Sequence, residues 1–297
     1  MQIKWLEDLI ALAQTRSFVR AAEMRHVTHP AFGRRIRALE RWAATPLVEP
    51  GGGPVTLTPA GQNLLQHALQ AVPALQRARD ELGGSPGDAS ECVTLSTGRT
   101  LARTIAADWL VRVRPQLAGG RVHVSTGSMG EILQRFERGE SDFMLAYHHP
   151  LIGIRLSSQH YLLRTLARDR LVPVTRINAQ GKPAHGFGGR QPAPYLAYAQ
   201  TLALGRLVDD HLTNHPQAPQ LREVIECDSA DALLEYALKG LGIAWLPWSL
   251  AGGACRARQL APVAGKSMEI GFEIRMVRPK RRLSPLAERL WLLVDPA

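Results

Sequence analysis

Residues 28–42 decide the fold of the first part of the chain, and they have the sequence THPAFGRRIRALERW. Thr28 can cap a helix at its start, and Pro30 stands in the first turn, where a missing N–H costs nothing. Ile36 and Leu39 are spaced to face a core. The rest of this helix is strongly basic and carries Arg34, Arg35, Arg37 and Arg41.

Two shorter helices are predicted before this basic helix. Apolar residues at helical spacing indicate an amphipathic helix over 3–13, and Ser17 can cap a second helix that ends near Arg25. A short turn at 26–27 separates the second helix from the third. A helix, a tight turn and a capped basic helix form a helix-turn-helix, whose second helix presents its N-terminal residues to DNA bases in the major groove. The alternative is a basic, solvated helix in an ordinary helical bundle. The residues expected to contact DNA are Thr28, His29, Pro30, Ala31, Arg34, Arg35 and Arg37.

A wing and a long helix are predicted next. Residues 45–48 and 55–57 favour two short strands around a glycine-rich loop, and a capped helix with Pro59 in its first turn follows over 59–84. Apolar positions along that helix step by three and four residues, which is typical of a helix that pairs with another helix. The dimerisation candidates are Leu65, Val72 and Leu75; the alternative is packing against the helix's own domain. The stretch 83–88 is rich in glycine and proline and predicts a linker.

Strands and helices alternate from about residue 91 onward, which predicts a largely parallel α/β sheet. Several predicted strands end in a hydroxyl-bearing residue or a glycine at the start of a helix. Ligands of open α/β sheets bind outside the carboxyl ends of strands, and helix N-termini attract anions. The residues predicted to line such a cleft are Thr97, Arg99, Thr100, Ser128, Tyr147 and Ser229. Each of them could instead serve only as a helix cap.

Composition limits the possible functions. The 297 residues carry a formal net charge of +10, which favours a polyanionic partner such as double-stranded DNA. Three scattered cysteines do not form a disulfide framework, and no membrane span or signal peptide is recognisable, so we expect a cytoplasmic protein without membrane contact. No catalytic motif occurs, so we expect no enzymatic activity, cofactor or metal. His211 and His215 stand one helical turn apart, but without a third ligand a surface pair is favoured.

The N-terminal motifs resemble the winged-helix signature of LysR-type transcriptional regulators. The residues that carry this resemblance are Ser17-Phe18, Ala21-Ala22, Pro30-Ala31, Arg34 to Glu40 and Leu57 to Gly61. It implies an N-terminal winged helix-turn-helix (1–58), a linker and dimerisation helix (59–84), and a two-lobed α/β effector domain like a periplasmic binding protein. Lobe 1 would comprise 91–167 and 268–297, and lobe 2 would comprise 168–267. The chain would cross between lobes near 168–174 and return near 268–277.

The resemblance also implies a function and an assembly. It predicts a homodimer, assembled further into a homotetramer, that binds DNA in sequence-specific fashion under control of a small effector between the lobes. Thr100 matches a position that often contacts the effector, and Tyr198 and Thr201 would face the cleft from lobe 2. Residues 32–40 and 242–247 are most similar to the hypochlorite-responsive branch, which makes oxidant stress a candidate signal. Met129 and Cys227 would then be the sulfur groups near the cleft; the alternative is a structural role for both.

The chain departs from the family pattern at three places. His29 stands where the family usually has Gln, and Gly33 where it usually has Ser; the wing carries no Lys or Arg over 49–54. His cannot pair with adenine as Gln does, and Gly weakens a helix. Two other functions therefore stay open: a cytoplasmic two-lobe solute-binding protein or enzyme of that fold, and a non-specific nucleoid-binding protein. Residues 1–84 argue against the first, and the specificity of DNA binding would test the second.

Overall fold

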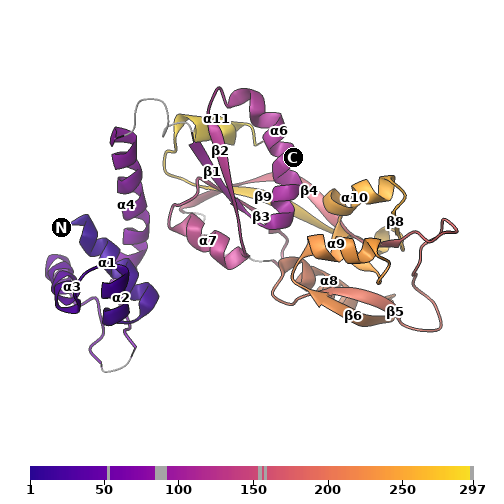
Figure 1. Cartoon of the computed structure of the whole chain (residues 1–297), viewed down its shortest axis with the longest axis horizontal. Coiled ribbons are helices and arrows are strands. Elements are labelled where there is room, and N and C mark those ends of the chain that lie inside the picture. The colour runs from indigo at the N-terminus through magenta and orange to yellow at the C-terminus, as the bar shows by residue number, and fades with distance from the viewer. Residues whose placement is uncertain (52–53, 84–91, 153–155, 157–158, 295–297) are drawn as a thin grey trace. The chain divides into compact units, whose positions relative to one another are not determined.

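The computed structural model describes residues 1–51, 54–83, 92–152, 156 and 159–294. By its contacts the chain divides into two compact units, Met1–Glu91 with Leu133–Ser141, and Cys92–Ile132 with Asp142–Ala297. Figure 1 labels the elements of both units. The tip of the predicted wing (52–53) and the predicted linker beyond residue 83 lie outside the described residues.

The four helices expected in the first unit are present, with ends within two residues of those predicted. They are α1 (Ile3–Thr15), α2 (Phe18–Met24), α3 (His29–Ala43) and α4 (Pro59–Gly83). Ser17 caps α2 as predicted, since its hydroxyl accepts a hydrogen bond from the Arg20 amide. Thr28 is the N-cap of α3 by position, but its side chain makes no capping hydrogen bond.

The expected pair of wing strands is reduced to a single antiparallel bridge. Val48 pairs with Leu57, and the Glu49 amide donates to the Thr56 carbonyl at 2.9 Å. A loop rich in glycine and proline between such short segments leaves few residues that can form a ladder. The described parts of the wing, 45–51 and 54–57, are thus joined by a bridge and do not form a small sheet.

The side chains that α1, α3 and α4 turn inward form the core of the first unit. Ile36 and Leu39 of α3 are 2% and 0% exposed, which confirms the face predicted for them. Phe32, also fully buried, joins Ile36 in a cluster with residues of α1 and α2, while Leu39 packs with Val72 of α4. Truncating a buried phenylalanine such as Phe32 costs about 3–5 kcal/mol.

The start of α4 explains the sequence LTPAG at 57–61. The Thr58 hydroxyl donates to the Pro46 carbonyl at 2.8 Å and accepts from the Gly61 amide at 3.0 Å, so it caps α4 and ties it to the wing. A Cβ on Gly61 would stand 2.1 Å from the Leu47 carbonyl oxygen. This close approach of helix and chain requires glycine at position 61.

The proposed pairing seam on α4 packs mostly within its own unit. Val72 is 4% exposed in the core, and Leu65 packs partly against the same cluster. Leu75 is 45% exposed. Of the three dimerisation candidates, Leu75 therefore offers the free apolar surface, and Val72 is already buried by α1 and α3.

The second unit is built on a mixed sheet in the strand order β2-β1-β3-β9-β4-β7, with β8 beside β4 and a separate pair β5-β6 (Figure 1). Its strands are β1 (Cys92–Thr97), β2 (Arg121–Thr126), β3 (Phe143–His148), β4 (Tyr161–Arg176), β5 (Ala193–Tyr198), β6 (Leu221–Cys227), β7 (Ala244–Pro247), β8 (Leu260–Pro262) and β9 (Ile270–Pro279). Its α-helices are α5 (Arg99–Arg103), α6 (Ile105–Val113), α8 (Ala203–Asn214), α9 (Ala230–Leu238), α10 (Trp248–Arg256) and α11 (Pro285–Leu292). Helix α7 (Met129–Glu137) begins in this unit, and its residues from Leu133 onward are assigned to the first unit.

The two long antiparallel strands β4 and β9 connect two lobes, as expected. We call β1–β3 with α5, α6 and α11 lobe 1, and β5–β8 with α8–α10 lobe 2. Strand β4 pairs with β9 along most of its length and then with β7 and β8 of lobe 2. On the other side, β9 pairs with β3 of lobe 1. The two-lobed architecture like that of periplasmic binding proteins is thereby confirmed.

The basic residues before the last helix are divided between strand and loop: Lys280, Arg281 and Arg282 are exposed in the loop that follows β9. Arg275 and Arg278 lie in β9. The Arg278 side chain is 5% exposed and binds both carboxylate oxygens of Glu288 on α11, at 2.6 and 2.8 Å. Its guanidinium also lies over the ring of Trp291, 5.6 Å from the centroid. Arg278 therefore links α11 to strand β9 through a charged hydrogen-bonded pair.

Candidate DNA-binding surface and effector site

The N-terminal half of α3 presents polar and basic side chains to solvent. Thr28, His29, Pro30, Arg34 and Arg37 are exposed, while Ala31 is half-buried. The Thr28 hydroxyl is not used as a cap, so it can contact a phosphate. These side chains therefore form an exposed polar and basic surface at the start of α3.

Arg35 differs from the other arginines of α3 because it is directed partly inward. Its guanidinium lies 3.4 Å from a carboxylate oxygen of Asp8, which is 0% exposed in α1. Arg25 binds the other oxygen of Asp8 at 2.9 Å and also pairs with Glu7. A fully buried carboxylate needs such partners. Arg35 thus links α3 to α1, whatever it contributes to DNA binding.

Two departures from the family pattern have a visible structural setting. The His29 ring stands edge-on to Phe18, with centroids 6.1 Å apart, so α2 restricts its orientation. A Cβ at Gly33 would meet one atom within 4 Å, a guanidinium nitrogen of Arg37 at 3.9 Å. Position 33 therefore has room for a side chain, and the glycine is not required by packing.

The two lobes of the second unit touch through Asp231, in the first turn of α9. The Thr100 hydroxyl of α5 donates to one oxygen of this carboxylate at 2.7 Å, and Arg103 binds the other at 2.9 Å. Thr100 and Arg103 stand 131 and 128 positions before Asp231 in the sequence. Hydrogen bonds to a charged group contribute about 1.5–3 kcal/mol each, less where the partner is as exposed as Arg103. Asp231 therefore links lobe 2 to lobe 1.

Two tyrosines, one from each lobe, have buried hydroxyl groups. Tyr147 is the penultimate residue of β3 and Tyr198 ends β5, and no group in the described part of the chain hydrogen-bonds to either hydroxyl. Burial is the main cause that raises the pKa of both phenols, and the nearby charge of Asp231 adds to it. Tyr147 also contributes to the raised pKa of Tyr198. Both phenols therefore stay protonated and can donate a hydrogen bond.

The other residues predicted for the cleft have different roles in the structure. Thr97 is fully buried and donates to the Leu145 carbonyl at 2.9 Å, so it stabilises the β1–β3 pairing. Ser229 caps α9, and Ser128 shares hydrogen bonds with Glu131 at the start of α7, as the capping alternative predicted. The remaining three, Arg99, Met129 and Thr201, are exposed. No described interaction joins any of these six residues to the two tyrosines.

Sequence reasoning missed Asp231 and Arg103. Acidic side chains are common in the first turn of a helix because they interact favourably with the positive end of the helix dipole. Nothing in the local sequence therefore marks Asp231 as a contact between lobes. Only the register of the whole sheet brings the starts of α5 and α9 together.

Among the described residues, no three His, Cys, Asp or Glu side chains are grouped to hold a metal ion. The His211 and His215 rings lie 5.0 Å apart. None of the described helices is both long and apolar enough for a membrane span.

Comparison with known proteins agrees with both parts of the chain. Residues 3–62 match the family of bacterial regulatory helix-turn-helix proteins of the lysR type, and residues 87–295 match the LysR substrate binding domain. The transcriptional regulator YjiE of Escherichia coli is 27% identical over 295 residues, which cover 98% of this chain and 93% of YjiE. The transcriptional activator IlvY of Salmonella typhimurium is 27% identical over 297 residues, or 99% of each chain.

Solved structures share the whole architecture. Vibrio fischeri DarR, determined in complex with DNA, superposes with a TM-score of 0.60 at 27% identity and covers 99% of this chain and 98% of its own. Full-length HypT of Salmonella typhimurium, a hypochlorite-specific LysR-type regulator, gives a TM-score of 0.59 at 26% identity, with 98% and 96% covered. Because both domain families match in order and together span nearly all of the sequence, the chain belongs to the LysR family and is a transcriptional regulator with an N-terminal DNA-binding domain and an effector-binding domain.

Proposed function

We propose that this regulator recognises a specific operator through Thr28, His29, Pro30, Ala31, Arg34 and Arg37 of α3, and that it works in the cytoplasm, where its DNA lies. Support comes from the exposed polar surface of α3 and from the net charge of +10. The wing adds no Lys or Arg over 49–54, so specificity depends mainly on the major-groove helix.

DNA binding is tested with the purified full-length protein on its own upstream DNA and on unrelated DNA of equal length, across a salt series. A specific regulator should bind its operator about 10³-fold or more tightly than the unrelated DNA and protect spaced half-sites. Equal and steeply salt-dependent binding to both DNAs would instead identify a non-specific nucleoid-binding protein.

A small effector would bind at the ends of β3 and β5, between Tyr147 and Tyr198. The observation that carries this proposal is the pair of buried phenol hydroxyls, contributed by two lobes, that no described protein group satisfies. Leaving a buried donor unpaired costs about 1–3 kcal/mol, so a ligand with an acceptor atom there would gain that energy. Such a ligand would change the separation of the lobes only if it binds one arrangement better than another.

The effector site is tested by screening small metabolites for ligands that raise the melting temperature of the full-length protein. A ligand of this site should stabilise the wild type but not the double variant Tyr147→Phe, Tyr198→Phe. The variant itself should be at least as stable as the wild type, because it removes two unsatisfied hydroxyls without changing the ring volume. A ligand that stabilises both proteins equally would bind elsewhere.

The dimer and tetramer expected for this regulator would use the exposed Leu75 on α4. Light scattering after size exclusion should show a dimer or tetramer for the wild type and a smaller species for Leu75→Asp. The matched control is Val111→Asp, which places the same charge on another exposed apolar position, in α6. Equal effects of the two substitutions would argue against α4 pairing through Leu75.

Hypochlorite is a specific candidate signal, because the chain resembles the HypT structures over nearly its full length. Hypochlorite can transfer its oxygen to the Met129 thioether, giving the sulfoxide and chloride, or oxidise the half-buried thiol of Cys227 to a sulfenic acid. The test compares DNA binding before and after oxidant for the wild type and for the double variant Met129→Leu, Cys227→Ser. An unchanged response in the variant would exclude both residues as sensors.

A further inference from the structure

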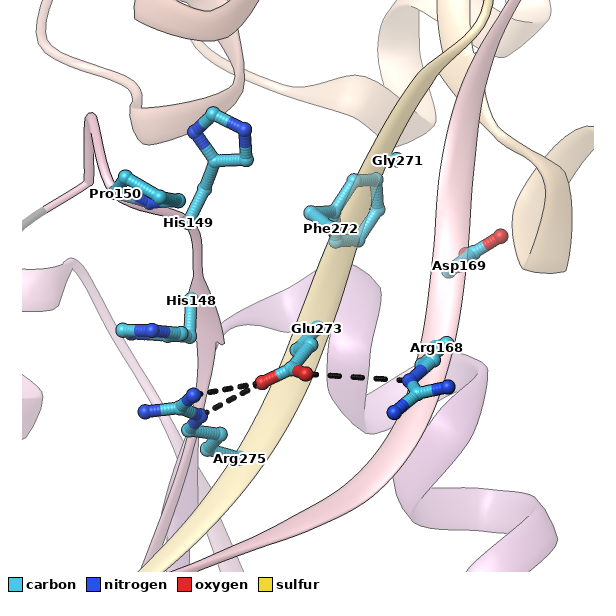
Figure 2. A pocket seen from close by; sticks show the side chains of 9 residues that line it. All are labelled: His148, His149, Pro150, Arg168, Asp169, Gly271, Phe272, Glu273 and Arg275. Carbon is cyan, nitrogen blue, oxygen red and sulfur yellow. Dashed lines mark hydrogen bonds and ion pairs between the residues drawn. The ribbon is translucent and has the colours of Figure 1, made fainter. Parts of the chain in front are cut away.

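A pocket of about 440 Å³ opens on the strands that connect the two lobes (Figure 2). It lies on β3, β9 and β4 in the second unit. The residues that line it are His148, His149, Pro150, Arg168, Asp169, Gly271, Phe272, Glu273 and Arg275. Its volume is within the range of small-molecule sites.

The strand register places three charged or polar side chains in one row across this pocket. His148 is the partner of Glu273, and Glu273 is the partner of Arg168. Cross-strand partners lie on the same face of a sheet, and successive residues of a strand alternate between faces. Tyr147 therefore faces the other side of β3, where its ring stands edge-on to that of Phe272 with centroids 5.3 Å apart.

The single carboxylate that Glu273 contributes to this row is already paired. Arg275 binds one of its oxygens through two nitrogens, at 2.9 and 2.8 Å, and the Thr165 hydroxyl donates to the same oxygen at 3.2 Å. The hydrogen bond from Arg275 is the largest cause that lowers the pKa of Glu273, so this carboxylate is ionised at neutral pH. Glu273 thus has little capacity left for a ligand.

The guanidinium groups of Arg168 and Arg275 have N–H donors that are not bound to Glu273. Arg168 meets the carboxylate only at 3.9 Å through Nε, and its side chain is 69% exposed. Its two terminal nitrogens and the Nη1 of Arg275 have no described hydrogen-bond partner. Figure 2 shows both guanidinium groups on either side of Glu273, with the His148 ring beside Arg275. The unused hydrogen-bonding capacity of the row and of the adjoining Arg275 therefore consists mainly of donors. Arg168 and Arg275 supply two positive charges, and Glu273 supplies one negative charge.

We propose that this pocket binds a small monocarboxylate, whose carboxylate group is held by Arg168 and Arg275. The planar fork of a guanidinium matches a carboxylate in geometry. One negative charge balances the excess positive charge of the row, and Pro150 offers apolar surface for the body of the ligand. Asp169, the other acid of the lining, alternates to the opposite face of β4 from Arg168 and accepts hydrogen bonds from the Ser249 amide. A regulator with this pocket has a second ligand site, on the strands shared by its lobes.

The experiment is isothermal titration of the full-length protein with butyrate and with its neutral isostere butyramide, at constant ionic strength. Butyrate should bind in the millimolar range, and butyramide should not bind measurably. Arg168→Gln should weaken butyrate about 10-fold, since it removes a charge-assisted contact from a side chain that is mostly exposed. The matched control Arg222→Gln removes the same charge from an exposed position on β6 and should leave the affinity unchanged.

Three results would overturn the proposal. They are absence of butyrate binding to the wild type, equal binding of butyramide and butyrate, and equal weakening by the Arg168 and Arg222 substitutions. Tyr198→Phe distinguishes this pocket from the effector site: it should not affect butyrate binding here. If Tyr198→Phe abolished binding while Arg168→Gln did not, the carboxylate would bind between the lobes instead.

Discussion

Alanine substitutions at Arg34 and Arg35 should separate a DNA-contacting arginine from a fold-stabilising one, although the two residues are neighbours on α3. Arg34 is exposed, and the structure shows no ion pair for it within the described residues. Arg35 is only 28% exposed and lies 3.4 Å from the buried carboxylate of Asp8. Arg35→Ala should therefore destabilise the first unit, whereas Arg34→Ala should weaken DNA binding alone.

The magnitudes follow from burial and distance. Removing one partner of a fully buried ion pair costs about 3–5 kcal/mol. Here the guanidinium is partly hydrated, the distance is long, and Arg25 remains bound to Asp8 at 2.9 Å, so we expect about 0.5–1.5 kcal/mol for Arg35→Ala. Arg34→Ala should change stability by less than about 0.5 kcal/mol and cost about 1–3 kcal/mol in operator affinity, or roughly 5- to 150-fold.

The assay combines hydrogen exchange of the amides in α1 and α3 with fluorescence anisotropy of a labelled operator. Hydrogen exchange reports local stability in a protein whose two units need not unfold together. The reasoning would be refuted if Arg35→Ala left exchange unchanged while weakening DNA binding as much as Arg34→Ala. Loss of protection in Arg34→Ala would refute it equally.

Three further substitutions test other parts of the structure. Gly33→Ser should stabilise α3 by up to about 1 kcal/mol, because the site has room and glycine is a poor helix former; urea unfolding monitored by the tryptophans would measure this gain. Gly61→Ala should destabilise the protein by about 2 kcal/mol or more in the same assay, because its Cβ would stand 2.1 Å from the Leu47 carbonyl oxygen. The bond to Arg278 lowers the pKa of Glu288 from 4.5 to about 2, so its stabilisation is present above pH 4.5 and lost as the pH falls toward 2. Because the Glu288 side chain is 37% exposed, we expect about 1–2 kcal/mol, and Glu288→Gln should abolish this part of the acid dependence in unfolding curves recorded from pH 3 to 6.

The elements of the fold were largely predictable, because the signals for them are local. The spacing of Ile36 and Leu39 gave the buried face of α3, and the alternation after residue 91 gave most strands of the second unit. The wing was predicted as two strands and forms one bridge, because strand propensity says little about how many residues of a short hairpin pair. The seam on α4 had the spacing of a coiled coil, but Val72 is buried by its own unit, and both arrangements produce the same periodicity.

The candidate sites were less predictable, because they depend on pairing between distant segments. Thr100 and Tyr147 were identified from strand ends, but their neighbour Asp231 is contributed by a helix more than 80 residues further along the chain. Arg275 begins a run of basic residues, and nothing in that run marks a partner for it. In the structure the register of β9 brings it to Glu273, and no sequence pattern specifies a register across three strands.

The central position of β9 has a consequence for synthesis on the ribosome. Strand β3 is complete at residue 148, but its partner β9 begins at residue 270, after all of lobe 2 has been made. Translation of the roughly 120 intervening residues takes about 10 s. During that time the nascent chain carries an unpaired and very apolar β3 edge, the kind of segment that aggregates or recruits chaperones. The completion of lobe 1 therefore waits until β9, the last of the described strands, and then α11 have emerged.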